Sequence, residues 1–160
     1  MNSVKMGHYP TCPDNLAGIA GGIAFREGQA LNLLDPCCGC GLALLQIADA
    51  ARDAGALPAT YGVELDSHRA AEAQGRLGRV GRGSFHFARI SREAFHLLFL
   101  NPPYMGVMTE KGGARSEKRF LADSIRHLMP GGVMVYVMRH SRVDREVAKL
   151  ICDNFDDVTA

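Results

Sequence analysis

The sequence lacks any apolar run long enough to cross a membrane, since a spanning helix needs about 20 consecutive apolar residues. Residues 1–5 also lack the apolar core of a secretory signal. We therefore expect a soluble cytoplasmic protein that has no membrane partner.

The chain also lacks a strong charge of either sign, because 18 Lys and Arg residues against 17 Asp and Glu residues give a net charge of +1. This balance neither requires nor excludes a nucleic-acid partner, so any basic surface must be local. Of the 160 residues, 47% are hydrophobic and 22% are charged, which is typical of a globular chain with a real core. No internal repeat or low-complexity segment divides the sequence, and we expect residues 1–160 to form a single domain.

A paired metal-binding pattern is missing as well. Three of the five cysteines, Cys37, Cys38 and Cys40, lie within four positions, but they form no CxxC pair and no second pair follows. We therefore expect no metal site. Small side chains packed in a tight glycine loop of a reduced protein explain these cysteines better.

Segments of apolar and helical character alternate along the chain and predict a doubly wound, mainly parallel α/β sheet with strand order 3-2-1-4-5. Thr11 and Asp14 have the spacing of a capping box and predict the start of a first helix. Asp66 or Ser67 is expected to cap a later helix. The other expected helices cover residues 42–54, 116–129 and 143–152. The expected strands cover residues 30–34, 60–63, 84–88, 95–100 and 133–138, with a sixth strand, cut short, beginning at 155.

The strand over 95–100 runs directly into Asn101, Pro102, Pro103 and Tyr104. Proline cannot continue a central strand, so the strand must end at Asn101, and the two prolines stiffen the turn that follows. Such a turn presents an amide, the carbonyl of Pro102 and an aromatic ring. The two oxygens accept the hydrogens of an NH2 group, and the aromatic ring stacks on the face of the planar group that carries it. This turn therefore predicts a binding site for a planar amine.

A glycine loop follows the first strand, with Asp35 at the strand end and Gly39 and Gly41 before the next helix. Glycines between a strand and a helix allow a ligand to approach the backbone closely. Glu64 follows the second strand, where an acidic residue holds the hydroxyls of an adenosine ribose. The third glycine of the dinucleotide fingerprint is absent, which argues against a nicotinamide cofactor.

Arg76, Arg79 and Arg82 alternate with glycines. One interpretation is a phosphate-binding patch. The expected position of the segment, between a helix and a strand at the amino edge of the sheet, favours a solvated turn instead.

These motifs, in this order, resemble the class I S-adenosylmethionine-dependent methyltransferases with an NPPY motif, and most of all the N6-adenine DNA methyltransferases. The resemblance covers nearly all of the chain. It implies that the 35–41 loop, including Pro36 and Cys37, cradles the methionine part of the cofactor, and that Glu64 and Leu65 lie at the ribose. It also implies that Tyr9 and Thr11 belong to the segment that closes over the methionine carboxylate, and that residues 130–132 form the turn before the fifth strand.

Two positions depart from the family pattern. The residue that contacts the cofactor adenine is either Ser84 or one at the end formed by Ala88 and Arg89. His96 replaces the aspartate that usually precedes the catalytic motif, and we expect it to be a core residue rather than a catalyst.

The resemblance implies direct methyl transfer to an amino group that Asn101 and Pro102 hold and Tyr104 stacks upon, with a DNA base leaving the helix to reach them. Adenine N6 in DNA is the favoured acceptor. An RNA base (guanine N2 or adenine N6), a protein glutamine amide, or an inactive cofactor-binding module are the alternatives. Several basic residues on the expected active face favour nucleic acid, namely Lys111, Arg115, Lys118, Arg119, Arg139 and Arg142.

The short chain leaves no room for a target-reading domain. We therefore expect that it is a fragment or that another chain completes its sheet and reads the target.

Overall fold

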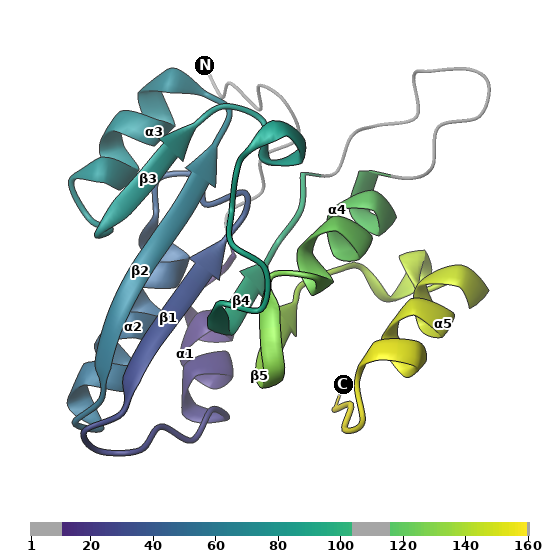
Figure 1. Cartoon of the computed structure of the whole chain (residues 1–160), viewed down its shortest axis with the longest axis horizontal. Coiled ribbons are helices and arrows are strands. Elements are labelled where there is room, and N and C mark those ends of the chain that lie inside the picture. The colour runs from purple at the N-terminus through teal and green to yellow at the C-terminus, as the bar shows by residue number, and fades with distance from the viewer. Residues whose placement is uncertain (1–10, 104–115, 160) are drawn as a thin grey trace.

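The computed structural model describes residues 11–103 and 116–159, and it contains a five-stranded sheet with the order β3-β2-β1-β4-β5 (Figure 1). All neighbouring strands pair in parallel. The strands are β1 (Ala30–Asp35), β2 (Leu57–Glu64), β3 (Arg79–Arg82), β4 (Phe95–Leu100) and β5 (Leu128–Tyr136). The helices are α1 (Pro13–Gly21), α2 (Leu42–Asp53), α3 (Ser67–Gln74), α4 (Ser116–Ile125) and α5 (Arg145–Asn154), with short 3-10 turns at Phe85–Phe87 and His140–Arg142. This confirms the doubly wound α/β sheet and its strand order.

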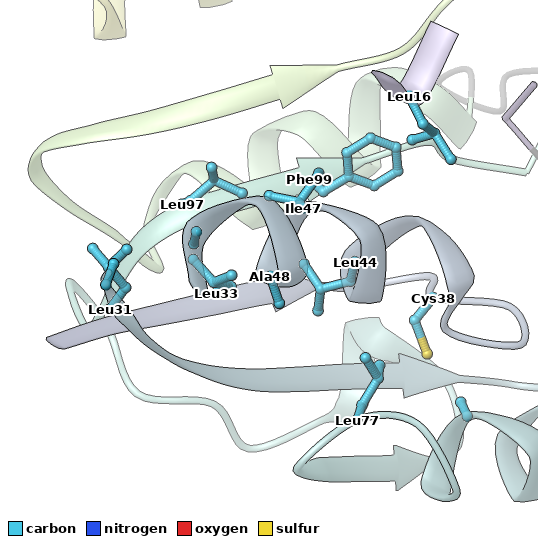
Figure 2. Close-up of a cluster of buried hydrophobic side chains, with 13 residues drawn as sticks. Leu16, Leu31, Leu33, Cys38, Leu44, Ile47, Ala48, Leu77, Leu97 and Phe99 are labelled. Atoms are coloured by element: carbon cyan, nitrogen blue, oxygen red, sulfur yellow. The ribbon is translucent and has the colours of Figure 1, made fainter. Parts of the chain in front are cut away.

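Two apolar clusters, one on each face of the sheet, make up the core. Leu33 of β1 and Phe99 of β4 pack with α1, α2 and the end of α3, and Figure 2 shows Leu44 and Ile47 of α2 among these side chains. Leu34 and Leu98, one position along each strand, pack instead with α4 and α5. Because successive residues of the central strands are buried on opposite faces, these strands are continuous apolar runs. No helix in residues 11–103 and 116–159 is long and apolar enough to cross a membrane.

The first helix does not begin with a capping box, so that prediction was wrong. Cys12 is the N-cap residue and makes no side-chain hydrogen bond to the helix, while Pro13 occupies the first turn. Thr11 makes its hydrogen bond across the molecule instead. The expected cap by Asp66 is confirmed, since its carboxylate accepts from the backbone N–H groups of His68 and Arg69.

The third strand lies at Arg79–Arg82 and not at 84–88 as expected. Its residues pair with Tyr61 to Glu64 of β2, which places Arg82 at the carboxyl edge of the sheet and not at the amino edge. Ser84 follows the strand, and Phe85 and Phe87 lie on a 3-10 turn, where Phe85 is buried and Phe87 is exposed. Among the described residues this strand has a hydrogen-bonded neighbour on one side only, so it does not need the apolar pattern of a central strand.

The last strand begins earlier than expected, and α4 ends earlier, at Ile125. Phe95 pairs with Leu128 and Leu97 pairs with Val133, so residues 129–132 bulge out where a turn before the strand was predicted. Residues 155–159 form no strand, and the expected start of a sixth strand was wrong. Within the described residues β5 is therefore an edge of the sheet.

Candidate active site at the carboxyl edge of the sheet

The strand order reverses between β1 and β4, and the loops that follow these two strands meet at the carboxyl edge. Leu33 and Leu34 of β1 pair with Leu97 and Leu98 of β4. Cys37, two residues beyond β1, donates its thiol hydrogen to the backbone carbonyl of Asn101 across 3.1 Å. Ligands of open parallel sheets bind at such a reversal. The sequence-based expectation that the Asp35 loop and the Asn101 turn are neighbours is therefore confirmed.

The side-chain amide of Asn101 is oriented by Thr11. Its Nδ2 donates to Thr11 Oγ1 across 2.9 Å, although the two residues are far apart in the sequence. Asn101 is half-buried, Pro102 is buried and Pro103 is half-buried. Two other expected site residues, Tyr9 and Tyr104, lie outside the described residues.

Asn101, Thr11, Asp35 and Cys37 line one cavity of about 380 Å³, together with Cys38, Cys40 and the first turn of α2. Gly39 and Gly41 alternate along the chain with the lining residues Cys38, Cys40 and Leu42. Their φ angles of 55° and 83° are values that a side chain would disfavour. Gly41 is also the N-cap of α2 and offers no capping side chain. The backbone N–H groups in the first turn of α2 therefore have no side-chain acceptor at the N-cap. Leu42 and Ala43 of this turn line the cavity, so these N–H groups lie beside it.

Asp35 is the buried charge of this cavity. It is 3% exposed, and its Oδ1 accepts from the backbone N–H of Cys37 across 2.9 Å. Burial raises the pKa of Asp35 to about 7, against the lowering effect of that hydrogen bond. Burial, and then the neighbouring Asp35, also raise the pKa of the Cys37 thiol. No Lys, Arg or His in the described residues forms an ion pair with Asp35. A buried carboxylate without a cationic partner is suited to bind the ammonium group of a ligand.

Glu64 is buried at the end of β2 and already has several donors. Its Oε2 accepts from the backbone N–H of Gly39 across 2.9 Å. Its Oε1 accepts from the N–H of Asp66 at 2.8 Å and from Arg69 Nη2 at 2.7 Å. A carboxylate has about four lone-pair positions, so Oε2 retains the capacity to accept a hydroxyl. The sequence predicted the role of Glu64 but not its contact with Arg69. Arg69 lies three residues after the helix cap Asp66, and this spacing in the first turn of a helix could have indicated a contact with Glu64.

A second cavity, of about 590 Å³, lies beside β2 and β3 and is also lined by residues of β1 and β4. Leu34, Tyr61 and Val63 contribute to its lining from β1 and β2, and residues 83–84 and 87–91 contribute from the segment that follows β3. Ser84, Ala88 and Arg89, the residues predicted near the cofactor adenine, all line this cavity. Leu65 is exposed and does not line it. Sequence analysis did not anticipate the cavity, because it misplaced β3.

The remaining candidates have structural explanations. His96 Nδ1 accepts from the backbone N–H of Asn32 across 3.0 Å, which agrees with a core role. No group of metal-binding side chains occurs in residues 11–103 and 116–159. Lys118 pairs with Glu146, Arg119 lies 3.7 Å from Asp123 and Arg142 lies 4.0 Å from Glu117. Lys111 and Arg115 lie outside the described residues.

Comparisons with known proteins agree with this arrangement. Residues 1–160 match a family described as "Uncharacterised methyltransferase family (DUF6094)". No curated protein matches the chain significantly.

Solved structures resemble the fold at low identity. A Listeria monocytogenes protein assigned to the class I S-adenosylmethionine-dependent methyltransferases has a TM-score of 0.76 at 15% identity, over 94% of this chain and 53% of that one. The type I restriction-modification methyltransferase subunit of Streptococcus thermophilus has a TM-score of 0.71 at 20% identity, over 94% of this chain and 40% of that one. A TehB-like methyltransferase from Corynebacterium glutamicum has a TM-score of 0.57 at 20% identity, over 88% and 77%. The chain thus spans about half the length of the first of these structures.

The family match covers the whole chain, and the site lies where a sheet of this order binds its ligand. The chain therefore belongs to this methyltransferase family, and S-adenosylmethionine is its expected cofactor.

Proposed function

We propose that this chain transfers a methyl group from S-adenosylmethionine to an exocyclic amino group, and that the acceptor is adenine N6 in DNA. One observation supports the amino acceptor above the others. The Asn101 amide is turned so that its Nδ2 is engaged by Thr11, beside a cavity that also contains the buried carboxylate of Asp35.

The residues of the carboxyl edge fit the cofactor in three respects. Asp35 is a buried carboxylate without a cationic partner in the described residues, which suits an α-ammonium group. Glu64 Oε2 has one donor, from Gly39, and can accept a ribose hydroxyl. Ser84 lines the neighbouring cavity, where an adenine amino group needs an acceptor. When bound, the cofactor supplies an electrophilic methyl group on a sulfonium.

The turn after β4 acts on the acceptor. An aromatic amine is a weak nucleophile because its lone pair is delocalised into the ring. Asn101 Oδ1 and the carbonyl oxygen of Pro102 accept its two hydrogens and concentrate the lone pair on nitrogen. The hydrogen bond from Asn101 Nδ2 to Thr11 determines which end of the amide is the acceptor, and this fixed orientation contributes to the rate.

One observation favours DNA. One similar structure is a restriction-modification methyltransferase subunit, whereas the NPPY motif serves RNA-base and glutamine acceptors as well as adenine N6 in DNA. Since the chain spans 40% of that structure, recognition of the target sequence by a further segment or a second chain is part of the proposal.

A methyl-transfer assay tests the proposal. Unmethylated DNA, RNA and a protein mixture are each incubated with methyl-labelled S-adenosylmethionine, and the digested products are analysed by mass spectrometry. We expect labelled N6-methyladenine from DNA, and its loss in Asn101→Ala even at saturating cofactor. Label found only in RNA nucleosides or in glutamine would reassign the acceptor. Label that persists in Asn101→Ala would contradict the role of the amide.

A further inference from the structure

The loop after β1 lies opposite the turn after β4, in the same register as the paired part of the two strands. Leu34 pairs with Leu98, and this register continued by three positions aligns Cys37 with Asn101. The bond from the Cys37 thiol to the Asn101 carbonyl, 3.1 Å long, joins these two residues. It therefore extends the contact between β1 and β4 beyond the residues that pair through their backbones.

The backbone of the loop does not supply this donor. Pro36 has no N–H group. The N–H of Cys37 donates to Asp35 Oδ1 across 2.9 Å. The N–H of Cys38 donates to the carbonyl of Val63, on β2, across 2.9 Å. With these groups missing or engaged elsewhere, the thiol of Cys37 supplies the donor that a strand would otherwise provide.

The end of β4 is held from both neighbouring strands. The carbonyl of Leu100 accepts from the N–H of Val137 across 2.8 Å, on the side of β5. Successive carbonyl groups of a strand point to opposite sides in the plane of the sheet, so the carbonyl of Asn101 points toward β1. The thiol of Cys37 meets it there. Two successive carbonyl groups are thus held where the turn begins.

The orientation of the Asn101 carbonyl determines that of the next carbonyl, which belongs to Pro102. The Asn101 carbonyl is part of the planar peptide group that joins the two residues. The ring of Pro102 fixes its φ angle, and the following Pro103 restricts its ψ angle. Pro102 is also buried. A bond that holds the Asn101 carbonyl therefore also holds the Pro102 carbonyl, one of the two oxygens that receive the acceptor amine in the proposed function.

The Cys37 side chain is itself fixed. It is half-buried and packs against the apolar cluster that contains Leu34, Leu98 and Leu100. Its backbone is held by the carboxylate of Asp35. Because Asp35 is the expected site of the ligand ammonium group, one residue joins the loop that binds the cofactor to the turn that binds the acceptor.

We propose that Cys37 is a positioning residue for methyl transfer, and that its thiol holds the peptide group between Asn101 and Pro102 in the orientation that the acceptor amine requires. The thiol touches no acceptor atom and takes part in no bond change. This role differs from the one that the resemblance implies for Cys37, which concerns the methionine part of the cofactor. The inference rests on the proposed function, since it concerns the turn that binds the acceptor.

Single-turnover methyl transfer to unmethylated DNA, at saturating S-adenosylmethionine, tests the inference. Cys37→Ala removes the donor and should lower the rate about 3- to 5-fold, since a thiol is a weak donor. Cys37→Ser keeps a donor and should restore most of the rate. A residue that only fills space would not be rescued by serine, which is smaller and more polar. The control Cys152→Ala removes an exposed thiol on α5 and should leave the rate unchanged.

Calorimetry with S-adenosylhomocysteine separates the two possible roles of Cys37. We expect both Cys37 variants to bind it as the unchanged protein does, which also shows that they fold. A loss of this affinity without a loss of rate at saturating cofactor would assign Cys37 to the cofactor and overturn the inference. Equal rates in Cys37→Ser and Cys37→Ala would overturn it as well.

Infrared spectroscopy measures the bond without methyl transfer. The difference spectrum between the unchanged protein and Cys37→Ala contains the S–H stretching band of this thiol alone. We expect the band at a lower frequency than that of a thiol in an apolar solvent, because the S–H group donates a hydrogen bond. If the unchanged protein transfers no methyl group, the proposed function fails and the band still decides whether the thiol holds the turn. A band at the frequency of a free thiol would overturn the inference.

Discussion

Substitution of Asp35 by Asn should make the protein more stable and its cofactor site weaker. Asp35 is 3% exposed and its pKa is raised from 3.8 to about 7 by burial. A raised folded-state pKa means that the contribution of the group to stability is complete below pH 3.8 and is lost as the pH rises through 7. Since about 1.4 kcal/mol corresponds to each pKa unit, the ionised group costs about 4 kcal/mol of folding stability at pH 8.

Asparagine keeps the oxygen that accepts from the Cys37 N–H but does not ionise. The stability gained by Asp35→Asn should therefore be larger at pH 8 than at pH 5 by roughly 2 to 3 kcal/mol. Urea unfolding of both proteins at the two pH values, followed by circular dichroism, measures this difference directly. Other titrating groups are common to both proteins and cancel. Asp153→Asn, which removes an exposed carboxylate on α5, serves as the control.

The same substitution should weaken S-adenosylhomocysteine binding about 10- to 100-fold, because a hydrogen bond to a charged group contributes about 1.5 to 3 kcal/mol. An equal gain in stability at both pH values would refute the burial argument. Unchanged affinity would refute the assignment of Asp35 to the ammonium group of the ligand.

Two further substitutions test the orientation of the amide and the packing of the loop. Thr11→Val removes the acceptor of the Asn101 Nδ2 hydrogen bond and should lower single-turnover methyl transfer at saturating cofactor about 5-fold, a loss of about 1 kcal/mol. Thr11→Ser should restore the rate, and equal rates in all three proteins would contradict the role of Thr11. Gly62→Ala would place a Cβ atom 2.7 Å from Cys38 Sγ and should lower the free energy of unfolding by about 1 to 3 kcal/mol. In Gly81→Ala the new Cβ would lie 3.9 Å from the backbone oxygen of Gly62, an ordinary contact, and urea unfolding should show a change within about 0.5 kcal/mol. Similar losses at both glycines would contradict the packing argument.

The central strands could be predicted closely from the sequence. β4 has the bounds expected, Phe95–Leu100, because burial on both faces produces an unbroken apolar run and prolines end it. The positions of Asp35 and Asn101 followed from the same reasoning, since parallel strands bring their carboxyl ends to one edge. The bounds of a strand buried on both faces can therefore be predicted from its own residues.

The peripheral strands and long-range contacts could not be predicted in this way. β3 has an edge position and contains Arg79 and Arg82, so neither burial nor alternation marks it as a strand. Thr11 matches a local capping pattern, yet its hydroxyl bonds to Asn101, 90 positions away. No local pattern carries that information, and the cavity beside β2 and β3, which depends on the position of β3, could not be predicted either.

Calorimetric titration with S-adenosylhomocysteine, with NADH and Glu64→Ala alongside, tests the central claim most directly. It requires neither the acceptor nor a target-reading partner. We expect micromolar binding of S-adenosylhomocysteine, weaker binding in Glu64→Ala because the buried carboxylate at Gly39 and Arg69 is lost, and no binding of NADH. Absence of S-adenosylhomocysteine binding, or a preference for NADH, would contradict the assignment of the carboxyl edge as a methyl-transfer site.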